Sequence, residues 1–127
     1  MSDRCTPSKN GGNSRYDLVV VGAGSAGFSA AITAAEQGAH VALVGHGTIG
    51  GTCVNIGCVP SKTLIRATEA VHHATAAPAR FDGIESSARV VDWAAQIAQK
   101  DTLVASLRKA KYADLLPEYN NIAYREG

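Results

Sequence analysis

The sequence has little of what marks nucleic-acid-binding or membrane-surface proteins. Its 12 Lys and Arg are balanced by 11 Asp and Glu, which leaves a net charge of +1 and no basic excess. Charged residues make up only 18% and hydrophobic residues 46%, a balance typical of a globular domain. This composition excludes collagen, a coiled coil and a disulfide-dense secreted scaffold. The 127 residues suffice for one domain with a modest core, and we expect neither a nucleic-acid nor a membrane partner.

Cysteine is also scarce, and the positions of the cysteines limit the kinds of metal or disulfide site that they can form. The three cysteines, Cys5, Cys53 and Cys58, cannot all pair within one chain. A structural zinc site needs a second pair of ligands some distance along the sequence, and none of the four histidines supplies that spacing. The close pair Cys53 and Cys58 therefore indicates redox or metal-handling chemistry rather than a structural disulfide.

Residues 18–35 form a run without charge that approaches the length of a membrane span or a signal-peptide core. Three glycines inside the run, Gly22, Gly24 and Gly27, would destabilise a single long helix. Their spacing is instead that of a nucleotide-binding motif, which is described below. We therefore expect no membrane segment and a cytoplasmic protein.

The first half of the chain is typical of an α/β fold. Residues 1–14 are polar and predict a disordered lead-in, which leaves residues 15–127 as the folded domain. A β-branched run over 16–21 predicts a strand buried on both faces, residues 25–37 predict a helix that ends at a glycine, and residues 39–44 predict a second strand. This βαβ unit implies parallel strands and a Rossmann-like architecture.

The second half is expected to be mostly helical. Lys100 and Asp101 interrupt the apolar stripe of the last helical region, which favours two helices there, and Pro117 ends it. With only a short third strand, the sheet would be incomplete compared with a doubly wound fold, which has about five or six strands. The expected elements are a glycine-dense loop over 45–52, a helix over 61–77, a loop over 78–88, helical structure over 89–116 and a strand over 121–125.

The glycines form a G-x-G-x-x-G motif between the first strand and the first helix. Gly22 would make the tight turn, Gly24 would let a pyrophosphate approach the backbone, and Gly27 would let helix and strand pack closely. The phosphate would sit at the helix N-terminus, where free N–H groups and the helix dipole favour an anion. This context predicts dinucleotide binding.

One part of the nucleotide motif is missing. An acid is expected about 20 residues on, at the end of the second strand, to hold the ribose hydroxyls. That position is Gly45, and no acid occurs anywhere from 37 to 68, so a backbone carbonyl, a water or His46 would have to substitute. Residues 45–50 also match G-x-G-x-x-G, but Glu69 lies in a helical pattern rather than at a strand end, so we interpret this match as a loop.

The cysteine pair lies in the string GGTCVNIGCVPSK. On a regular helix, residues five apart have Cα atoms about 8.6 Å apart and about 140° around the axis, whereas a disulfide needs less than about 7 Å. Cys53 and Cys58 can therefore bridge only if the backbone leaves the helix between them, which Gly57 permits. Pro60 suits a first helical turn, which would place Cys58 at a helix N-terminus that favours its thiolate. The alternative is two buried apolar cysteines.

These strings resemble the pyridine nucleotide–disulfide oxidoreductases, the FAD enzymes that include glutathione reductase and dihydrolipoyl dehydrogenase. Within that family the mercuric reductases are most similar, on GTIGGTCVNIGCVPSK, IRA at 65–67 and LRKAKYADLL at 107–116. The resemblance covers residues 16–127. It implies that Cys53 is the interchange thiol that meets the substrate, that Cys58 lies against the flavin, and that the two form a redox disulfide with Cys5 left free. It also implies FAD contacts by Gly22, Gly24, Gly27, Gly47, Thr52 and Lys62.

The resemblance also implies a reaction. A hydride passes from NADPH to FAD, electrons pass to the disulfide, and the thiolates bind Hg(II), which leaves as Hg(0). Full-length members are homodimers. A second G-x-G-x-x-G for NADPH, a dimerisation domain and a C-terminal cysteine pair do not occur in the 127 residues, so we expect a partial FAD domain that is inactive alone.

Two other hypotheses stay open. One is a different flavin disulfide reductase, with a lipoyl or glutathione substrate. The other is a non-enzymatic thiol module that binds Hg(II), or a gene remnant. On the residues alone, two interpretations of Lys62 stay open. It could place a cation beside a thiolate or a flavin ring, or it could be a solvated surface lysine.

Overall fold

The structure is a computed structural model that describes residues 15–127, so the expected lead-in over 1–14, with Cys5, lies outside the described residues. Three parallel strands form one sheet in the order β1-β2-β3, with Leu43 of the central strand paired with Val20 and Tyr124. The strands are β1 (Leu18–Val21), β2 (Val41–Gly45) and β3 (Ile122–Glu126). The predicted α/β class with parallel strands is confirmed.

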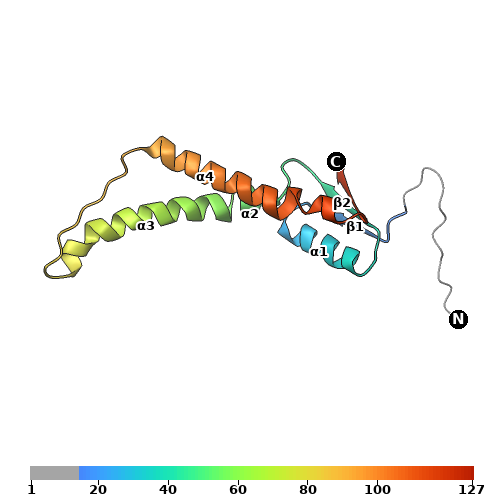
Figure 1. The fold of residues 1–127 in the computed structure, drawn as a ribbon, viewed down its shortest axis with the longest axis horizontal. Coiled ribbons are helices and arrows are strands. Elements are labelled where there is room, and N and C mark those ends of the chain that lie inside the picture. Colours follow the sequence, from blue (N-terminus) through green and yellow to red (C-terminus); the bar gives the residue numbers. More distant parts are fainter. Residues whose placement is uncertain (1–14) are drawn as a thin grey trace.

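Helices occur in the three predicted regions, and a short helix over Gly51–Asn55 was not predicted (Figure 1). The second predicted helix is longer than expected, whereas the last begins at Trp93 rather than at residue 89. The uncharged run over 18–35 is divided between β1 and α1 by the glycine turn. Among residues 15–127, no helix is long and apolar enough to cross a membrane. The helices are α1 (Ser25–Glu36), α2 (Gly51–Asn55), α3 (Cys58–Arg80) and α4 (Trp93–Arg108), followed by a π-helical turn η1 (Lys109–Ala113) and a 3-10 turn η2 (Leu116–Glu118).

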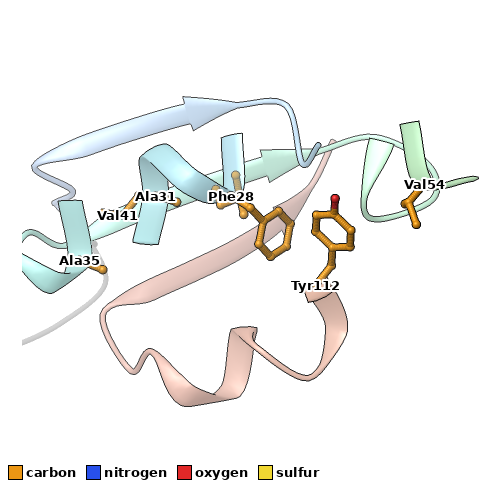
Figure 2. Packing of buried hydrophobic residues seen from close by; sticks show 7 residues of the cluster. Phe28, Ala31, Ala35, Val41, Val54 and Tyr112 are labelled. Carbon is orange, nitrogen blue, oxygen red and sulfur yellow. The ribbon is translucent and has the colours of Figure 1, made fainter. Parts of the chain in front are cut away.

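The core lies between α1 and the central strand β2 and is closed by η1 (Figure 2). Val41 and Leu43 are completely buried on β2. The rings of Phe28 and Tyr112 meet edge to face, with centroids 4.9 Å apart and an angle of 81° between the planes. Such aromatic pairs contribute about 0.5–1.5 kcal/mol beyond the area they bury. The core therefore ties η1, late in the sequence, to the helix that follows the glycine turn.

The prediction that the first strand is buried on both faces is wrong. Val19 is 56% exposed and Val21 is 84% exposed. Among the described residues, β1 pairs only with β2, so it lies at an edge of the sheet. An uninterrupted β-branched run therefore does not by itself distinguish a central strand from an edge strand here.

The predicted loop at Pro78 is also corrected, because α3 continues through Pro78 to Arg80. Proline has no N–H, so the carbonyl of Ala74, four residues earlier, loses its helical partner. The Ser86 hydroxyl donates a 2.6 Å hydrogen bond to that carbonyl. A residue from the following segment thus satisfies the carbonyl, and the helix extends past the proline.

The expected interruption at Lys100 and Asp101 does not occur either, since α4 is continuous over both residues. Their side chains form an ion pair with each other at the helix surface. Asp92 caps the start of α4 by accepting a 3.0 Å hydrogen bond from the Ala95 N–H. The regular helix ends at Arg108 instead, where the wider η1 turn places Tyr112 in the core.

Candidate functional site

The turn between β1 and α1 has the geometry that the glycine motif requires. The Gly22 N–H donates a 2.7 Å hydrogen bond to the Val44 carbonyl, which attaches the turn to β2. A Cβ atom on Gly27 would lie 1.8 Å from the Gly22 carbonyl oxygen, so only glycine allows the helix to pack this closely on the turn. Gly24 caps α1 without a side chain, and the first turn of α1 carries no acid. The first N–H groups of α1 therefore lack a side-chain acceptor and suit an anionic ligand.

A hollow of about 310 Å³ lies at the carboxyl ends of β1 and β2, beside this turn. No acidic side chain lines it. His46, the sequence-level candidate for a ribose contact, is exposed and lies in its wall. The lining residues are Val21, Gly22, Ala23, Gly24, Val44, His46, Thr48, Gly51 and Gly127.

The second glycine-rich segment packs directly on the first. Residues 46–50 are a loop, which is shorter than the loop expected over 45–52, because Gly45 ends β2 and Gly51 and Thr52 begin α2. The Gly50 N–H donates a 2.8 Å hydrogen bond to the Ala23 carbonyl, and Gly24 and Gly50 form an isolated parallel bridge. Gly47 lies in this loop and Thr52 in the first turn of α2, so both flank the hollow without lining it. The loop joins the glycine turn to the helix that carries the first cysteine of the pair.

The backbone between Cys53 and Cys58 leaves the helix, as a contact between the two thiols requires. α2 ends at Asn55 and α3 begins at Cys58, with Gly57 between them. A Cβ atom on Gly57 would lie 2.9 Å from the Thr52 carbonyl oxygen and 3.1 Å from the Cys53 Cα atom. A side chain at position 57 would therefore hold the two helices apart. Pro60 lies in the first turn of α3, as predicted.

The two thiols lie side by side at the surface. Both are exposed and free, which contradicts the alternative of two buried apolar cysteines, and the disulfide between them stays a prediction. A hydrogen bond with the Cys58 side chain is the main cause that raises the pKa of Cys53, followed by partial desolvation. A backbone hydrogen bond at Cys58 and, to a smaller extent, the positive charge of Lys62 act in the opposite direction and lower the pKa of Cys53. Lys62, itself exposed, therefore lies close enough to act on the thiol pair.

Asn55, which the sequence analysis did not single out, fixes the geometry of this segment. Its amide donates hydrogen bonds to the carbonyls of Ile49 at 3.0 Å and Gly51 at 2.8 Å. Its side-chain oxygen accepts a 3.0 Å hydrogen bond from Arg108 at the end of α4. The break in the helix directly after Asn55 is readable from the sequence, whereas the partner in α4 is not.

Tyr112 is a second residue that the sequence analysis did not identify. Its hydroxyl lies 2.7 Å from the hydroxyl of Ser25, the first residue of α1. The hydrogen bond fixes the start of α1 against η1, next to the glycine turn. Tyr112 lies within the LRKAKYADLL string that carried part of the resemblance, but its partner could not be read from that string.

Comparison with known proteins agrees with this geometry. Residues 16–122 match the family described as pyridine nucleotide-disulphide oxidoreductase. A mercuric reductase from Lysinibacillus sphaericus is 56% identical over 105 residues, covering 83% of this chain and 19% of that protein. A mercuric reductase from Streptomyces lividans is 53% identical over 104 residues, covering 82% of this chain and 22% of that protein.

Solved structures give the same result. The HOCl-induced flavoprotein disulfide reductase RclA from Escherichia coli is 32% identical, with a TM-score of 0.67 over 88% of this chain and 22% of that one. Its Cu(II) complex matches with a TM-score of 0.65 and 31% identity, over 85% of this chain and 21% of that one. The chain spans about a fifth of the length of the relatives it matches. By its sequence match over residues 16–122, the chain belongs to the pyridine nucleotide–disulphide oxidoreductase family.

Proposed function

We propose that this chain supplies the first part of the FAD-binding domain of a flavin-dependent disulfide oxidoreductase that reduces Hg(II) to Hg(0) with NADPH. The observation that carries the proposal is the hydrogen bond from Gly50 to Ala23. It connects the glycine turn to the helix that begins at Gly51 and contains Cys53, so a nucleotide site and a thiol pair belong to one folded unit. The mercuric reductase relatives, at 41–56% identity, support mercury as the substrate.

The residues around the glycine turn fit FAD. Gly22, Gly24 and Gly27 form a backbone cradle, and the N–H groups of α1 that lack a side-chain acceptor would hold the pyrophosphate. Gly47 and Thr52 would contact the cofactor where it runs from the hollow toward α2, and Lys62 would lie near the flavin ring. When bound, FAD supplies the route by which two electrons pass from NADPH to the thiol pair.

Cys53 and Cys58 would bind the metal substrate as thiolates. Hg(II) is a soft ion that accepts two sulfur ligands, whereas a structural zinc ion needs about four ligands. Within residues 15–127, no group of three or more His, Cys, Asp and Glu side chains could hold a metal ion. Binding releases the proton that the hydrogen-bonded Cys53 thiol retains, and the charge of Lys62 favours that release.

A flavin reductase with an organic disulfide substrate is the second candidate. The likeness to the flavoprotein disulfide reductase RclA supports it, at 31–33% identity for three RclA structures. The higher identity to the mercuric reductases favours the mercury substrate. Dimerisation is expected from the family resemblance alone.

A thiol titration tests the substrate-binding part. The reduced chain carrying Cys5→Ser, titrated with Hg(II) and with Zn(II), should bind one Hg(II) tightly and Zn(II) only weakly. The Cys53→Ser/Cys58→Ser variant should lose most of the mercury binding. Unchanged Hg(II) uptake by that variant would refute the assignment of the site.

A chimera tests the enzymatic part. Residues 16–122 would replace the matching segment of the Lysinibacillus sphaericus mercuric reductase. The chimera should retain bound FAD and mercury-dependent NADPH oxidation, and the same chimera with Cys53→Ser should lose the oxidation. A folded, yellow chimera without mercury-dependent activity would contradict the proposal. The 127-residue chain alone should not oxidise NADPH with Hg(II), because its single strand–glycine–helix motif is assigned to FAD.

A further inference from the structure

The structure gives a steric reason for the glycine at the end of β2, where a ribose-binding acid was expected. A Cβ atom on Gly45 would lie 2.6 Å from the Ala23 Cβ atom, 2.7 Å from the Tyr124 hydroxyl and 3.0 Å from the Tyr124 Cε2 atom. Heavy atoms without a bond between them do not approach this closely without a shift of one partner. An acidic side chain at position 45 would therefore need the space that Tyr124 occupies.

Tyr124 reaches this position from the neighbouring strand. β3 pairs with β2 so that Leu43 faces Tyr124 and Gly45 faces Glu126, and the Tyr124 side chain extends diagonally toward Gly45. Tyr124 is half-buried and packs against the same core cluster that contains Val41 and Leu43. Its hydroxyl lies 2.7 Å from the point where the side chain of residue 45 would begin, and the Ala23 Cβ atom of the glycine turn lies 2.6 Å from the same point.

The Tyr124 hydroxyl does not line the hollow, but it lies against Gly45, between the lining residues Val44 and His46. Within the described residues it takes part in no hydrogen bond, although a phenol can both donate and accept one. The remaining sequence-level candidate, His46, is exposed and lies in the wall of the hollow. Tyr124 differs from His46 in that the sheet register fixes its position beside the turn.

We propose that the Tyr124 hydroxyl replaces the missing carboxylate and hydrogen-bonds a ribose hydroxyl of the adenosine part of the bound dinucleotide. The proposal rests on the proposed function, because it requires a dinucleotide at the glycine turn. A carboxylate accepts hydrogen bonds from the 2′- and 3′-hydroxyls and repels a 2′-phosphate. A neutral phenol retains the hydrogen bond and brings no negative charge to the site.

Nucleotide affinity tests the proposal directly. The dissociation constants of ADP and of 2′,3′-dideoxy-ADP would be measured by calorimetry for the full chain and for Tyr124→Phe. One neutral hydrogen bond contributes roughly five-fold in affinity, so the wild-type chain should prefer ADP by about that factor. Tyr124→Phe should bring that preference close to one. Tyr119→Phe removes a phenol that bonds Glu36 instead, and it should leave the preference unchanged.

A rescue experiment separates a ribose contact from a packing role. Gly45→Glu alone should lower the melting temperature, because the new side chain meets Tyr124 and Ala23. Gly45→Glu combined with Tyr124→Ala should recover part of that loss and restore the preference for ADP, now through a carboxylate.

The outcomes separate the two proposals. A wild-type chain that binds neither ADP nor FAD would overturn this inference for the isolated chain, whereas the proposed function is decided separately by the chimera. A wild-type chain that prefers ADP, with the same preference in Tyr124→Phe, would overturn the role of Tyr124 alone. Loss of the preference in His46→Ala but not in Tyr124→Phe would assign the contact to His46 instead.

Discussion

The Arg108 guanidinium donates a 3.0 Å hydrogen bond to the side-chain oxygen of Asn55 and so connects the end of α4 to the segment between the two cysteines. The amide of Asn55 at the same time bonds the carbonyls of Ile49 and Gly51. One side chain thereby holds the glycine loop, α2 and α4 in a fixed arrangement. The distance between the two thiols depends on that arrangement, although Asn55 has no redox chemistry of its own.

Asn55→Ala should destabilise the chain and disturb the thiol pair. Loss of the hydrogen bonds to Ile49, Gly51 and Arg108, the last a charged group, predicts a decrease of about 2 kcal/mol in the free energy of unfolding, measured with urea. The reduction potential of the Cys53–Cys58 pair should rise, because the two thiols are no longer held close together. Arg108→Leu removes only one of these bonds and should cost less. An unfolding free energy and a potential equal to those of the wild type would contradict this role.

Comparison of Tyr112→Phe with Tyr112→Ala should separate the contribution of the Tyr112 hydroxyl to stability from that of its ring. Removal of the hydrogen bond to Ser25 should cost about 1 kcal/mol. Tyr112→Ala should cost about 3–5 kcal/mol, because it also removes the ring that packs on Phe28. In a double-mutant cycle, Ser25→Ala should add almost nothing to Tyr112→Phe. Fully additive costs would show that the two hydroxyls do not interact.

Gly27→Ala should reverse the usual preference of helices for alanine. Alanine is normally favoured over glycine inside a helix by about 1 kcal/mol. Here the new methyl would lie 1.8 Å from the Gly22 carbonyl oxygen, so the turn must move, at a cost of about 3 kcal/mol or more. The matched control is Ser29→Ala, at an exposed position of the same helix, which should be neutral or slightly stabilising. Thermal unfolding of the two variants measures the difference, and equal melting temperatures would refute the close contact.

The reactivity of Cys53 should follow the charges and hydrogen bonds around it. Its pKa is raised, mainly by the hydrogen bond with Cys58, so its thiolate forms at higher pH than that of an ordinary thiol. In a Cys5→Ser background, iodoacetamide labelling of Cys53 should therefore begin at higher pH than labelling of a model thiol. Cys58→Ala should move the profile to lower pH, and Lys62→Gln should move it to higher pH. A Lys62→Gln profile that stays in place would show that Lys62 is only a solvated lysine.

The parts of the fold that the sequence predicted are those set by local rules. The βαβ unit, the glycine turn and the helix break at Gly57 each depend on residues within a few positions of one another. Proline rules placed the end of α3 too early, because Ser86 supplies the partner that Ala74 lacks. Lys100 and Asp101 pair on the helix surface, so two charges in the stripe do not end α4.

The least predictable parts of the site depend on contacts between distant segments. Gly45 could be identified as a missing acid from the sequence, but the side chain that fills its space comes from β3. The partners of Asn55 and Ser25 likewise come from α4 and η1. Gly45, Asn55 and Ser25 each lie in a sequence motif. The residues that contact them can be identified only from the sheet register and the helix packing.

The arm formed by α3 and α4 extends away from the sheet, and none of the 23 residues of α3 is buried (Figure 1). Because α3 buries so little apolar area, the far end of the arm should open locally at a small free-energy cost, without unfolding the sheet. Amide hydrogen exchange should therefore be fastest near Arg80 and become slower toward Cys58, where Asn55 and Arg108 hold the base of the arm. Opening of the tip is thus decoupled from the thiol pair, and a protease that cuts between α3 and α4 should leave Cys53 and Cys58 in contact.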